Sequence, residues 1–540
     1  MDFPNIAVGI IAQNDEAALK KTVQDAKTFS DAVFIIGTSA GTAAPFLGDA
    51  AVNVLFSRSE GETDQQNELI EYIESGCSAD YLLWMTAGDR FDRQTFEELR
   101  LFTQSELERN SLYMLVVRRL YRQDGFRHDF DEENIEPRLI PLNKGLRYQS
   151  GTGTSIIEAA KSLLLKISAA PGRIIRFGGE KEQEYRRTQA EKLLQPFRLG
   201  NAESGDLAAR AEAFFILGQY GEAFRDFMKL TETPNRSDLQ LAGYYGLWDI
   251  LTKQSAAHLP TLKTEDLTKI LIGALDKFPV DMQLLTWMGV QLQSIGKLDL
   301  AVRSYQTALK FGRISLDVWH RLHIREIALT RLALLHRILG EPYEAIRLME
   351  DGLNEVEDPA ELSRYLLDLY IAEEKESKAL DLAATIWGDT DLDKMRNVIY
   401  GACRGTAGSW GEALNYIERA YRSGVRDVLC LRWYSLALLS SRKFPDAVNI
   451  LEEWLAVEPD SREAESFLTA AKQPEHFSET IGRIRDAQLK ALGIPKDKQP
   501  HKTGRQRVPS IERAVQEMIL ASGGSGGGKI ISTFGKKQSI

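Results

Sequence analysis

The residues best placed for chemistry follow a short apolar run at residues 81–85, YLLWM. An Asp–Arg pair, Asp89 and Arg90, comes shortly after this run, behind a turn of small residues that includes Gly88. A run of this length with aromatic side chains predicts a strand covered on both faces. Ligands of parallel α/β sheets bind beyond the carboxyl ends of the strands, so Asp89 stands where a ligand or cation could bind. An ordinary strand-to-helix turn is the alternative, because Gly and Asp are common turn residues.

A second group of candidates is cationic and lies in RRLYRQDGFRHDF, at residues 118–130. Guanidinium groups make bidentate contacts with phosphate, so a pocket that neutralises phosphate without a metal is possible here. Acidic residues alternate with the arginines, and mutual pairing on a solvated hairpin is therefore the favoured interpretation. The acidic run that follows is predicted to be a solvated loop rather than a source of a general base. The residues concerned are Arg118, Arg119, Arg122, Arg127, His128, Asp131, Glu132 and Glu133.

Strands and helices alternate in front of these candidates. Apolar runs at residues 6–12, 32–36 and 51–56 predict three strands before the one at 81–85. An amphipathic helix follows the first strand, and another at residues 62–74 leads into the fourth. Four strands separated by helices predict an α/β domain with a mostly parallel sheet.

These elements resemble the GT-A glycosyltransferases of family two, in particular a bacterial subgroup that carries tetratricopeptide repeats behind the transferase domain. The resemblance covers roughly residues 4–195. IAVGIIAQNDE resembles the opening strand and the Lys-Asn-Glu-Glu turn that lines the family's nucleotide pocket, and FIIGTSAGT resembles the second strand. Asn67 takes the place of the Asn in an Arg-Asn pair, and YLLWMTAGDRF resembles the strand that ends in an Asp-x-Asp motif.

The resemblance implies a Rossmann-like GT-A domain that binds a nucleotide sugar together with Mn²⁺ or Mg²⁺. Asp89 is the residue that it assigns to the metal. The residues that it assigns to the nucleotide sugar are Gln13, Asn14, Glu16, Thr38, Ser39, Asn67 and Asp89.

The sequence departs from the family at its acidic positions. Gly37, Thr86 and Gly88 stand where the family has Asp, and Asp89 is the carboxylate that remains nearby. A hard cation is held by one or two carboxylates plus phosphate oxygens, so a single Asp leaves transferase activity open. One hypothesis is a glycosyltransferase-like protein that binds a nucleotide sugar and recruits an acceptor. The alternative is a non-catalytic scaffold in which the repeats bind the partner.

A helical repeat begins near residue 208 and has a period of 34 residues. Small residues recur at Ala345, Ala379, Ala413 and Ala447, and subtraction gives 34 for each step. Related positions extend the pattern back to about seven helical pairs, and Gly289 and Tyr305 match the small and large positions of tetratricopeptide repeats. The pattern predicts a solenoid that binds a protein or peptide partner.

Composition limits the remaining classes. The chain has 540 residues, a formal net charge of -10 and three cysteines without paired spacing. Acidity argues against a nucleic-acid binder, and the cysteines indicate neither a disulfide framework nor a zinc site. The first apolar run, of about nine residues, is too short for a signal peptide or a membrane span. We therefore expect a cytoplasmic protein.

The expected organisation has three parts. They are a glycosyltransferase-like domain at residues 1–195, a solenoid at 196–472 and a C-terminal part at 473–540 that holds a helix, a basic linker, a short amphipathic helix and a flexible tail. His320 and His323 lie at i and i+3 of an expected helix, where packing or surface roles are favoured over metal binding.

Overall fold

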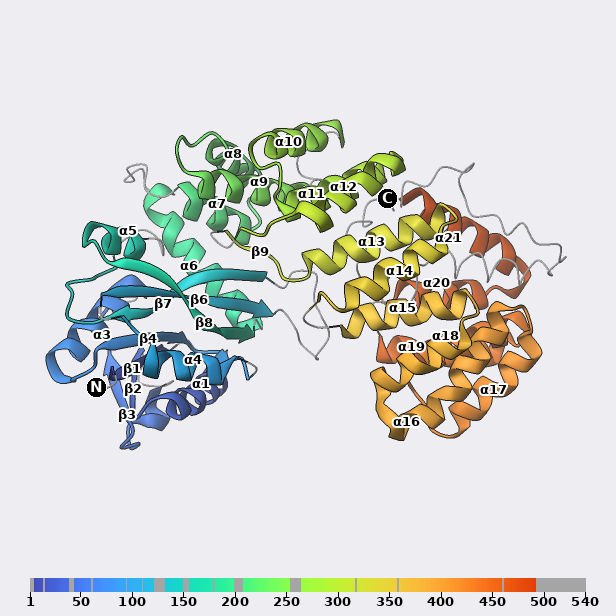
Figure 1. The fold of residues 1–540 in the computed structure, drawn as a ribbon, viewed down its shortest axis with the longest axis horizontal. Helices are drawn as coiled ribbons and strands as arrows, with labels where there is room; N and C mark the ends of the chain where they lie inside the picture. Colours follow the sequence, from blue (N-terminus) through green and yellow to red (C-terminus); the bar gives the residue numbers. More distant parts are fainter. Residues whose placement is uncertain are drawn as a thin grey trace. The chain divides into compact units, whose positions relative to one another are not determined.

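The structure is a computed structural model in which the chain divides into two compact units, each described by itself (Figure 1). Unit 1 comprises Met1–Lys263 and Ile314–Leu322, and unit 2 comprises Thr264–Arg313 and His323–Ile540. The domain limits expected at residues 195 and 472 stay predictions. The described residues are 4–12, 15–37, 43–59, 62–93, 95–108, 110–120, 132–148, 155–177, 180–198, 207–252, 264–315, 318–356, 359–458 and 461–491.

Four parallel strands form one half of the sheet in unit 1, in the order β3-β2-β1-β4. All six residues of β4 are buried, as the apolar run predicts. The carboxyl ends of β1, β2 and β4 therefore meet at one edge, with Ile11 opposite Thr86 in the register. The elements of this half are β1 (Ile6–Ile11), α1 (Glu16–Phe29), β2 (Ala32–Gly37), η1 (Ala44–Phe46), β3 (Val52–Phe56), α3 (Glu62–Gly76) and β4 (Tyr81–Thr86).

The other half of the sheet is mixed, which corrects the expectation of a mostly parallel sheet. β7 lies antiparallel to β4 and β6, β8 is parallel to β6, and β5 and β9 add antiparallel edges. The connection between β6 and β7, residues 121–131, is shorter than a parallel crossover requires, so these two strands pair antiparallel. The strands are β5 (Asp89–Phe91), β6 (Ser111–Leu120), β7 (Glu132–Pro141), β8 (Lys166–Phe177) and β9 (His320–Arg321).

Helices cover both faces of the sheet and form two separate cores. On one face, α1 and α4 (Phe96–Ser105) contribute Leu19, Val23 and Leu99. On the other face, α3 and α5 (Ser155–Ser162) contribute Leu69 and Ile156, which pack with Trp84 of β4. The two-sided cover explains why β4 is a continuous apolar run rather than an alternating one.

Unit 1 also contains four helices and the segment that carries β9. The helices are α6 (Glu180–Arg198), α7 (Leu207–Ile216), α8 (Tyr220–Leu230) and α9 (Ser237–Thr252). Arg321 of β9 donates from Nη2 to both carboxylate oxygens of Asp249 on α9, at 2.8 and 2.6 Å. This buried ion pair and the β7–β9 pairing hold the segment in unit 1.

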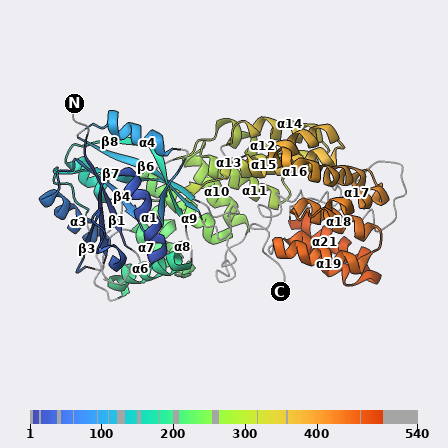
Figure 2. The same ribbon diagram turned by 90° about the horizontal axis from the view of Figure 1, so that it is seen from below.

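Unit 2 is an array of helices in which neighbours along the chain pack side by side (Figures 1 and 2). The four alanines that define the 34-residue period are fully buried. Gly340 and Gly408 have φ of 84° and 87° in the turns between helices, as expected for turn glycines. The array is consistent with a tetratricopeptide-like solenoid.

Helix α16 (Glu376–Thr406) is kinked at Gly388, where φ is 72° and ψ is 170°, and it packs against the helices before and after it in the chain. The helix expected at the start of the C-terminal part is present as α21 (Phe477–Ala491), and residues 492–540, with the basic linker, the amphipathic helix and the tail, lie outside the described residues. No helix in the described part of the chain is both long and apolar enough to cross a membrane. The elements of unit 2 are α10 (Thr264–Lys277), α11 (Met282–Ser294), α12 (Leu298–Phe311), α13 (Ile324–Ile338), α14 (Pro342–Leu353), α15 (Ala360–Ala372), α16 (Glu376–Thr406), α17 (Trp410–Arg422), α18 (Val428–Ser440), α19 (Phe444–Val457), α20 (Arg462–Ala471), η3 (Pro474–His476) and α21 (Phe477–Ala491).

Candidate functional site

Asp89 begins the short strand β5, which folds back from the end of β4. Gly88 precedes it with φ of 99°, a conformation that glycine adopts without steric cost. The hydroxyl of Thr22 on α1 accepts a hydrogen bond from Gly88 N at 3.0 Å and donates one to the Asp89 carbonyl at 2.9 Å. The turn is therefore fixed by α1, and the Asp89 side chain is fully enclosed.

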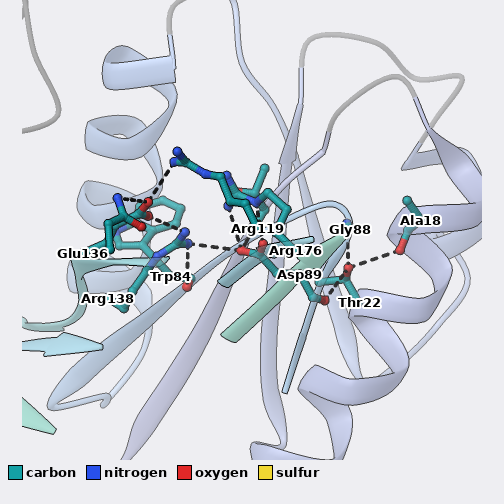
Figure 3. Close-up of polar contacts among 11 residues, drawn as sticks. Ala18, Thr22, Trp84, Gly88, Asp89, Arg119, Glu136, Arg138 and Arg176 are labelled. Carbon is teal, nitrogen blue, oxygen red and sulfur yellow. Dashed lines mark hydrogen bonds and ion pairs between the residues drawn. The ribbon is translucent and has the colours of Figure 1, made fainter. Parts of the chain in front are cut away.

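Two arginines and one backbone amide bind the Asp89 carboxylate (Figure 3). Arg176 stands opposite Asp89 in the β5–β8 register and donates from Nε to Oδ1 at 2.6 Å and from Nη2 to Oδ2 at 3.0 Å. Arg138 Nη1 and Thr86 N donate to Oδ2 at 3.2 and 2.8 Å. Such charge-assisted, bidentate contacts are the strong class of hydrogen bond. Asp89 is thus the centre of a closed ion-pair group.

A second carboxylate, Glu136 on β7, extends this group. Its Oε1 accepts from Arg119 Nη2 at 2.9 Å, and its Oε2 accepts from Arg138 Nη2 at 2.6 Å. Burial raises the pKa of Glu136, but the charges of Arg138, Arg119 and Arg176 outweigh burial and hold that pKa well below its usual value. We call Asp89, Arg119, Glu136, Arg138 and Arg176 the Arg–carboxylate cluster.

The Arg–carboxylate cluster contains more arginines than carboxylates among its five named residues. It holds three guanidinium groups and two carboxylates, and subtraction leaves one positive charge. It lies beside the carboxyl end of β4, because Arg138 also donates to the Trp84 carbonyl at 3.3 Å.

Ion pairs continue from the cluster along β6 and β7. Arg118 Nε donates to Glu133 Oε2 at 2.5 Å, and His320 Nε2 of β9 lies 3.7 Å from Glu133 Oε1. Burial raises the pKa of Glu133, but His320 and Arg118 together lower it to about 2. Pairing of the arginines with acidic residues is confirmed for Arg118 and Arg119, but their side chains are mostly enclosed rather than solvated. The expected solvated loop is wrong for Glu132 and Glu133, which are part of strand β7, and Asp131 lies outside the described residues.

One donor within the cluster and one donor beside it are buried and make no hydrogen bond with any described residue. They are Nε of Arg138 and Nε1 of Trp84. The two residues are neighbours on β7 and β4, since Leu83 pairs with Leu139 in the register. Leaving a buried donor unpaired costs about 1–3 kcal/mol.

Some of the residues expected to bind a nucleotide sugar lie outside the described part of the chain, and the others contact different partners. Gln13, Asn14, Thr38 and Ser39 lie outside the described residues. Glu16, in the first turn of α1, is half exposed and pairs with Lys20 at 2.6 Å. Asn67 on α3 donates to Tyr148 O and accepts from Tyr148 N, both at 2.8 Å. Among the described residues, no hydrogen bond connects Glu16 or Asn67 with Asp89, so the proposed grouping stays a prediction.

A divalent cation does not fit the donor set around Asp89. Both carboxylate oxygens accept from guanidinium groups, whereas Mn²⁺ or Mg²⁺ would bind such oxygens directly. In the described parts of the chain, no three His, Cys, Asp or Glu side chains come together as metal ligands. Metal binding at Asp89 stays a prediction that would require Arg138 and Arg176 to move away.

Sequence reasoning missed Arg138, Glu136 and Thr22 as parts of this site. Glu136 and Arg138 are two residues apart, which places both on one face of a strand, and that spacing is a readable signal. The contact of Arg138 with Asp89 depends on the pairing of β7 with β4, which is not readable from either strand alone. The contact of Arg176 with Asp89 depends in the same way on the pairing of β5 with β8.

The two histidines do not share a helix, which corrects the earlier expectation. His320 is part of β9 and lies near Glu133, whereas His323 precedes α13 and lies 3.5 Å from Glu326. They belong to different units.

No family model matches the sequence, and no curated protein matches it. Among solved structures, the chain is similar to a tetratricopeptide repeat protein from Parabacteroides merdae, with 14% identity over 49% of this chain and 98% of that chain and a TM-score of 0.34. It is similar to the C-terminal part of a TPR repeat-containing protein from Cytophaga hutchinsonii, with 16% identity, coverage of 48% and 97%, and a TM-score of 0.30. It is also similar to the APC/C hetero-tetramer Cut9–Hcn1, with 14% identity, coverage of 54% and 60%, and a TM-score of 0.24.

Proposed function

We propose that this chain is a non-catalytic interaction protein. Its tetratricopeptide-like array binds a protein or peptide partner, and its α/β domain resembles a glycosyltransferase without performing metal-dependent transfer. The observation that supports this proposal is the closed carboxylate of Asp89, which is fully buried and bound by Arg138 and Arg176.

Metal-dependent transfer needs carboxylates that hold a cation against the diphosphate of the donor. Moving Asp89 to a metal would leave the buried guanidinium groups of Arg138 and Arg176 without their partner. Breaking a buried ion pair in this way costs about 3–5 kcal/mol. The cluster therefore opposes the recruitment of Asp89 to a metal, and Thr86 and Gly88 supply no carboxylate in its place.

The array supports partner binding by its architecture. Helix pairs that repeat every 34 residues build an extended surface from many copies of one motif, and solenoids of this kind use such surfaces for binding. The alanines at the period are fully buried and serve packing, so a partner would bind to other faces of the helices. A segment of another polypeptide is the partner that such a surface fits best.

A second candidate function is the binding of a nucleotide sugar without a metal. The unpaired donors of Arg138 and Trp84 favour it. Diphosphate oxygens are acceptors that these donors could bind. The ligand would then extend over the predicted residues Gln13, Asn14, Glu16, Thr38, Ser39 and Asn67.

Thermal unfolding of the full chain with UDP- and GDP-sugars, with and without Mn²⁺, tests both functions. A ligand present at a hundred times its dissociation constant adds about 2.7 kcal/mol of stability. The main proposal expects no stabilisation and no sugar release that depends on Mn²⁺. Metal-dependent turnover would overturn it.

The second candidate expects stabilisation that Mn²⁺ does not change. Trp84→Phe removes the unpaired donor and keeps an aromatic ring, so it should weaken this stabilisation. Trp410→Phe is the matched control, because Trp410 Nε1 in unit 2 is also buried without a hydrogen bond to the described residues. Equal effects of the two variants would reject a nucleotide site at Trp84.

Partner binding is tested by capture on the immobilised full chain, followed by crosslinking and mass spectrometry. Crosslinks to helices of unit 2 are expected. Crosslinks confined to unit 1 would show that the array is not the binding element.

A further inference from the structure

β3 is the last strand at one end of the sheet in unit 1, and its outer edge is paired with no described strand. Ser57 N, directly behind β3, donates to Gly37 O of β2 at 3.0 Å. Backbone groups of successive strand residues point to opposite sides, so Val54 and Phe56 direct their N–H and C=O groups away from β2. A row of unpaired backbone groups of this kind is a template for a further strand.

The sequence of β3, VNVLF, has none of the features that usually keep the edge of a sheet from pairing. Charged side chains, proline and bulges are the common protection, and residues 52–56 include neither a charged residue nor a proline. The register with β2 also runs without a shift from Val52 to Phe56. β3 is therefore a regular, uncharged edge that is open to pairing.

Large apolar side chains lie exposed on both faces of the sheet at this edge. Phe56 shares a face with Val54, which packs against the core on the α1 side, and Phe56 is 48% exposed. On the α3 side, the ring of Tyr72 lies 6.2 Å from that of Phe34, which stands opposite Asn53 in the register. Tyr72 is also 48% exposed. A strand added to β3 would remove apolar surface from water on both faces.

The charges at the two ends of β3 favour a second copy of this chain as the added strand. Asp49 precedes β3 and is partly exposed, and Arg58 follows β3 and is exposed. When two β3 strands pair antiparallel around Val54, position 58 of one stands opposite position 50 of the other. Arg58 then lies beside Asp49 of the partner subunit at both ends of the pair. The edge is self-complementary, as a two-fold interface requires.

We infer that the chain forms a two-fold symmetric dimer in which the β3 strands of two copies pair antiparallel and join their sheets into one. At the axis, Val54 N donates to Val54 O of the partner subunit, and the reverse bond also forms. Phe56 N donates to Val52 O of the partner subunit, whereas Val52 N keeps its bond to Asp49 O at 3.0 Å. The dimer goes beyond the proposed function and does not depend on it, because β3 belongs to unit 1.

Sedimentation velocity of the full chain over a concentration series tests the dimer. The wild type should change from the monomer mass to twice that mass as the concentration rises. Val54→Pro should stay monomeric where the wild type is dimeric, because proline removes the outward N–H and is tolerated at such edge positions. Val54→Ala keeps the N–H group and should still form the dimer.

A charge placed on the edge should act against the dimer as well. Phe56→Lys should raise the dimer dissociation constant about tenfold or more. Leu101→Lys is the matched control, because Leu101 on α4 is 60% exposed and lies outside β3, and it should leave that constant unchanged. Arg58→Glu brings a second acidic group beside Asp49 and should weaken the dimer about fivefold, with a smaller effect at high salt.

Cysteine crosslinking tests the register. With Val54 at the axis, position 53 stands opposite position 55 of the partner subunit in a non-hydrogen-bonded pair, whose Cα atoms lie about 4.5 Å apart. A mixture of the Asn53→Cys and Leu55→Cys proteins should form an intermolecular disulfide on mild oxidation, whereas neither variant should do so alone. The wild type, which has three free cysteines of its own, measures the background.

Several results would overturn the inference. A wild type that is monomeric throughout the series would do so, and this is the result expected if a strand of a different protein covers β3. A dimer that Val54→Pro and Phe56→Lys leave equally stable would place the interface elsewhere. Crosslinks in either cysteine variant alone, without one in the mixture, would reject the register. Thermal unfolding shows whether each variant folds, and if Val54→Pro does not, Phe56→Lys compared with Leu101→Lys decides.

Discussion

Asp89 and Arg176 face each other across β5 and β8, and Arg176 donates to both oxygens of the Asp89 carboxylate at 2.6 and 3.0 Å. The two residues are 87 positions apart in the chain, and the sheet register brings them together. The residue that the sequence assigns to metal binding therefore has a built-in cationic partner. The family resemblance implies that Asp89 binds a metal, whereas in the folded chain the Asp89 carboxylate is bound by Arg176.

Asp89→Asn should destabilise unit 1 strongly. The amide removes the negative charge while Arg138 and Arg176 stay buried, and breaking such a pair costs about 3–5 kcal/mol. Urea denaturation measures the change in the free energy of unfolding. Hydrogen exchange of β5 and β8 then shows whether the change affects these two strands. Asp49→Asn is the control, because Asp49 pairs with Lys27 at the surface and should leave that free energy nearly unchanged. If Asp89→Asn and Asp49→Asn had equal stabilities, the proposed structural role of Asp89 would be wrong.

Gly88→Asp should destabilise the turn and should not create a metal site. The φ of 99° at Gly88 is rarely adopted by residues with a side chain, and such strain costs about 1–3 kcal/mol. The control is Gly48→Ala, because the φ of Gly48 is not positive and an added Cβ meets nothing within 4 Å. Thermal unfolding with and without Mn²⁺ measures both effects. A rise in stability of Gly88→Asp that depends on Mn²⁺ would contradict this expectation.

Gly88 illustrates which parts of the fold and of the site could be predicted from the sequence and which could not. Local patterns such as the apolar run of β4 and the 34-residue alanine period depend on neighbours along the chain, and the structure confirms them. The mixed half of the sheet depends on long-range pairing, so the partners of Asp89 were not predictable. In the comparison with the family, Gly88 stands where an Asp is expected, which suggests that a carboxylate has been lost. The backbone conformation at this position is one that favours glycine, and it gives a physical reason for the residue.

Low pH should weaken unit 1 through Glu133. Its pKa falls from 4.5 in the unfolded chain to about 2 in the folded protein. A depressed pKa contributes stability that is complete above pH 4.5 and is lost as the pH falls toward 2, about 3 kcal/mol in total. Glu133→Gln should therefore be less stable than the wild type at neutral pH and show a smaller loss between pH 5 and pH 2.

Hydrogen exchange of β7 at each pH measures this difference. Glu16→Gln is the control, since Glu16 is half exposed on α1. The stability of this variant should follow that of the wild type across the pH range. Parallel pH curves for Glu133→Gln and the wild type would show that the ion pair with Arg118 does not contribute.

Gly289→Ala should destabilise unit 2, although alanine favours helices. A Cβ at position 289 would lie 2.5 Å from Cε1 of Tyr305, and the ring is fully buried. Forcing such a contact in a packed core costs about 1–3 kcal/mol. Gly411→Ala is the matched control on α17, because an added Cβ there meets nothing within 4 Å, and it should gain up to about 1 kcal/mol.

Combining Gly289→Ala with Tyr305→Leu tests the cause, because a smaller side chain makes room for the new methyl group. The loss from Gly289→Ala should be smaller in the Tyr305→Leu background than in the wild type, and thermal unfolding of the four proteins gives this coupling energy. Additive losses would mean that the α11–α12 contact does not depend on the fit of Gly289 against Tyr305. A smaller loss from Gly289→Ala in the Tyr305→Leu background would establish that the small and large positions of the repeat determine how closely its two helices approach each other.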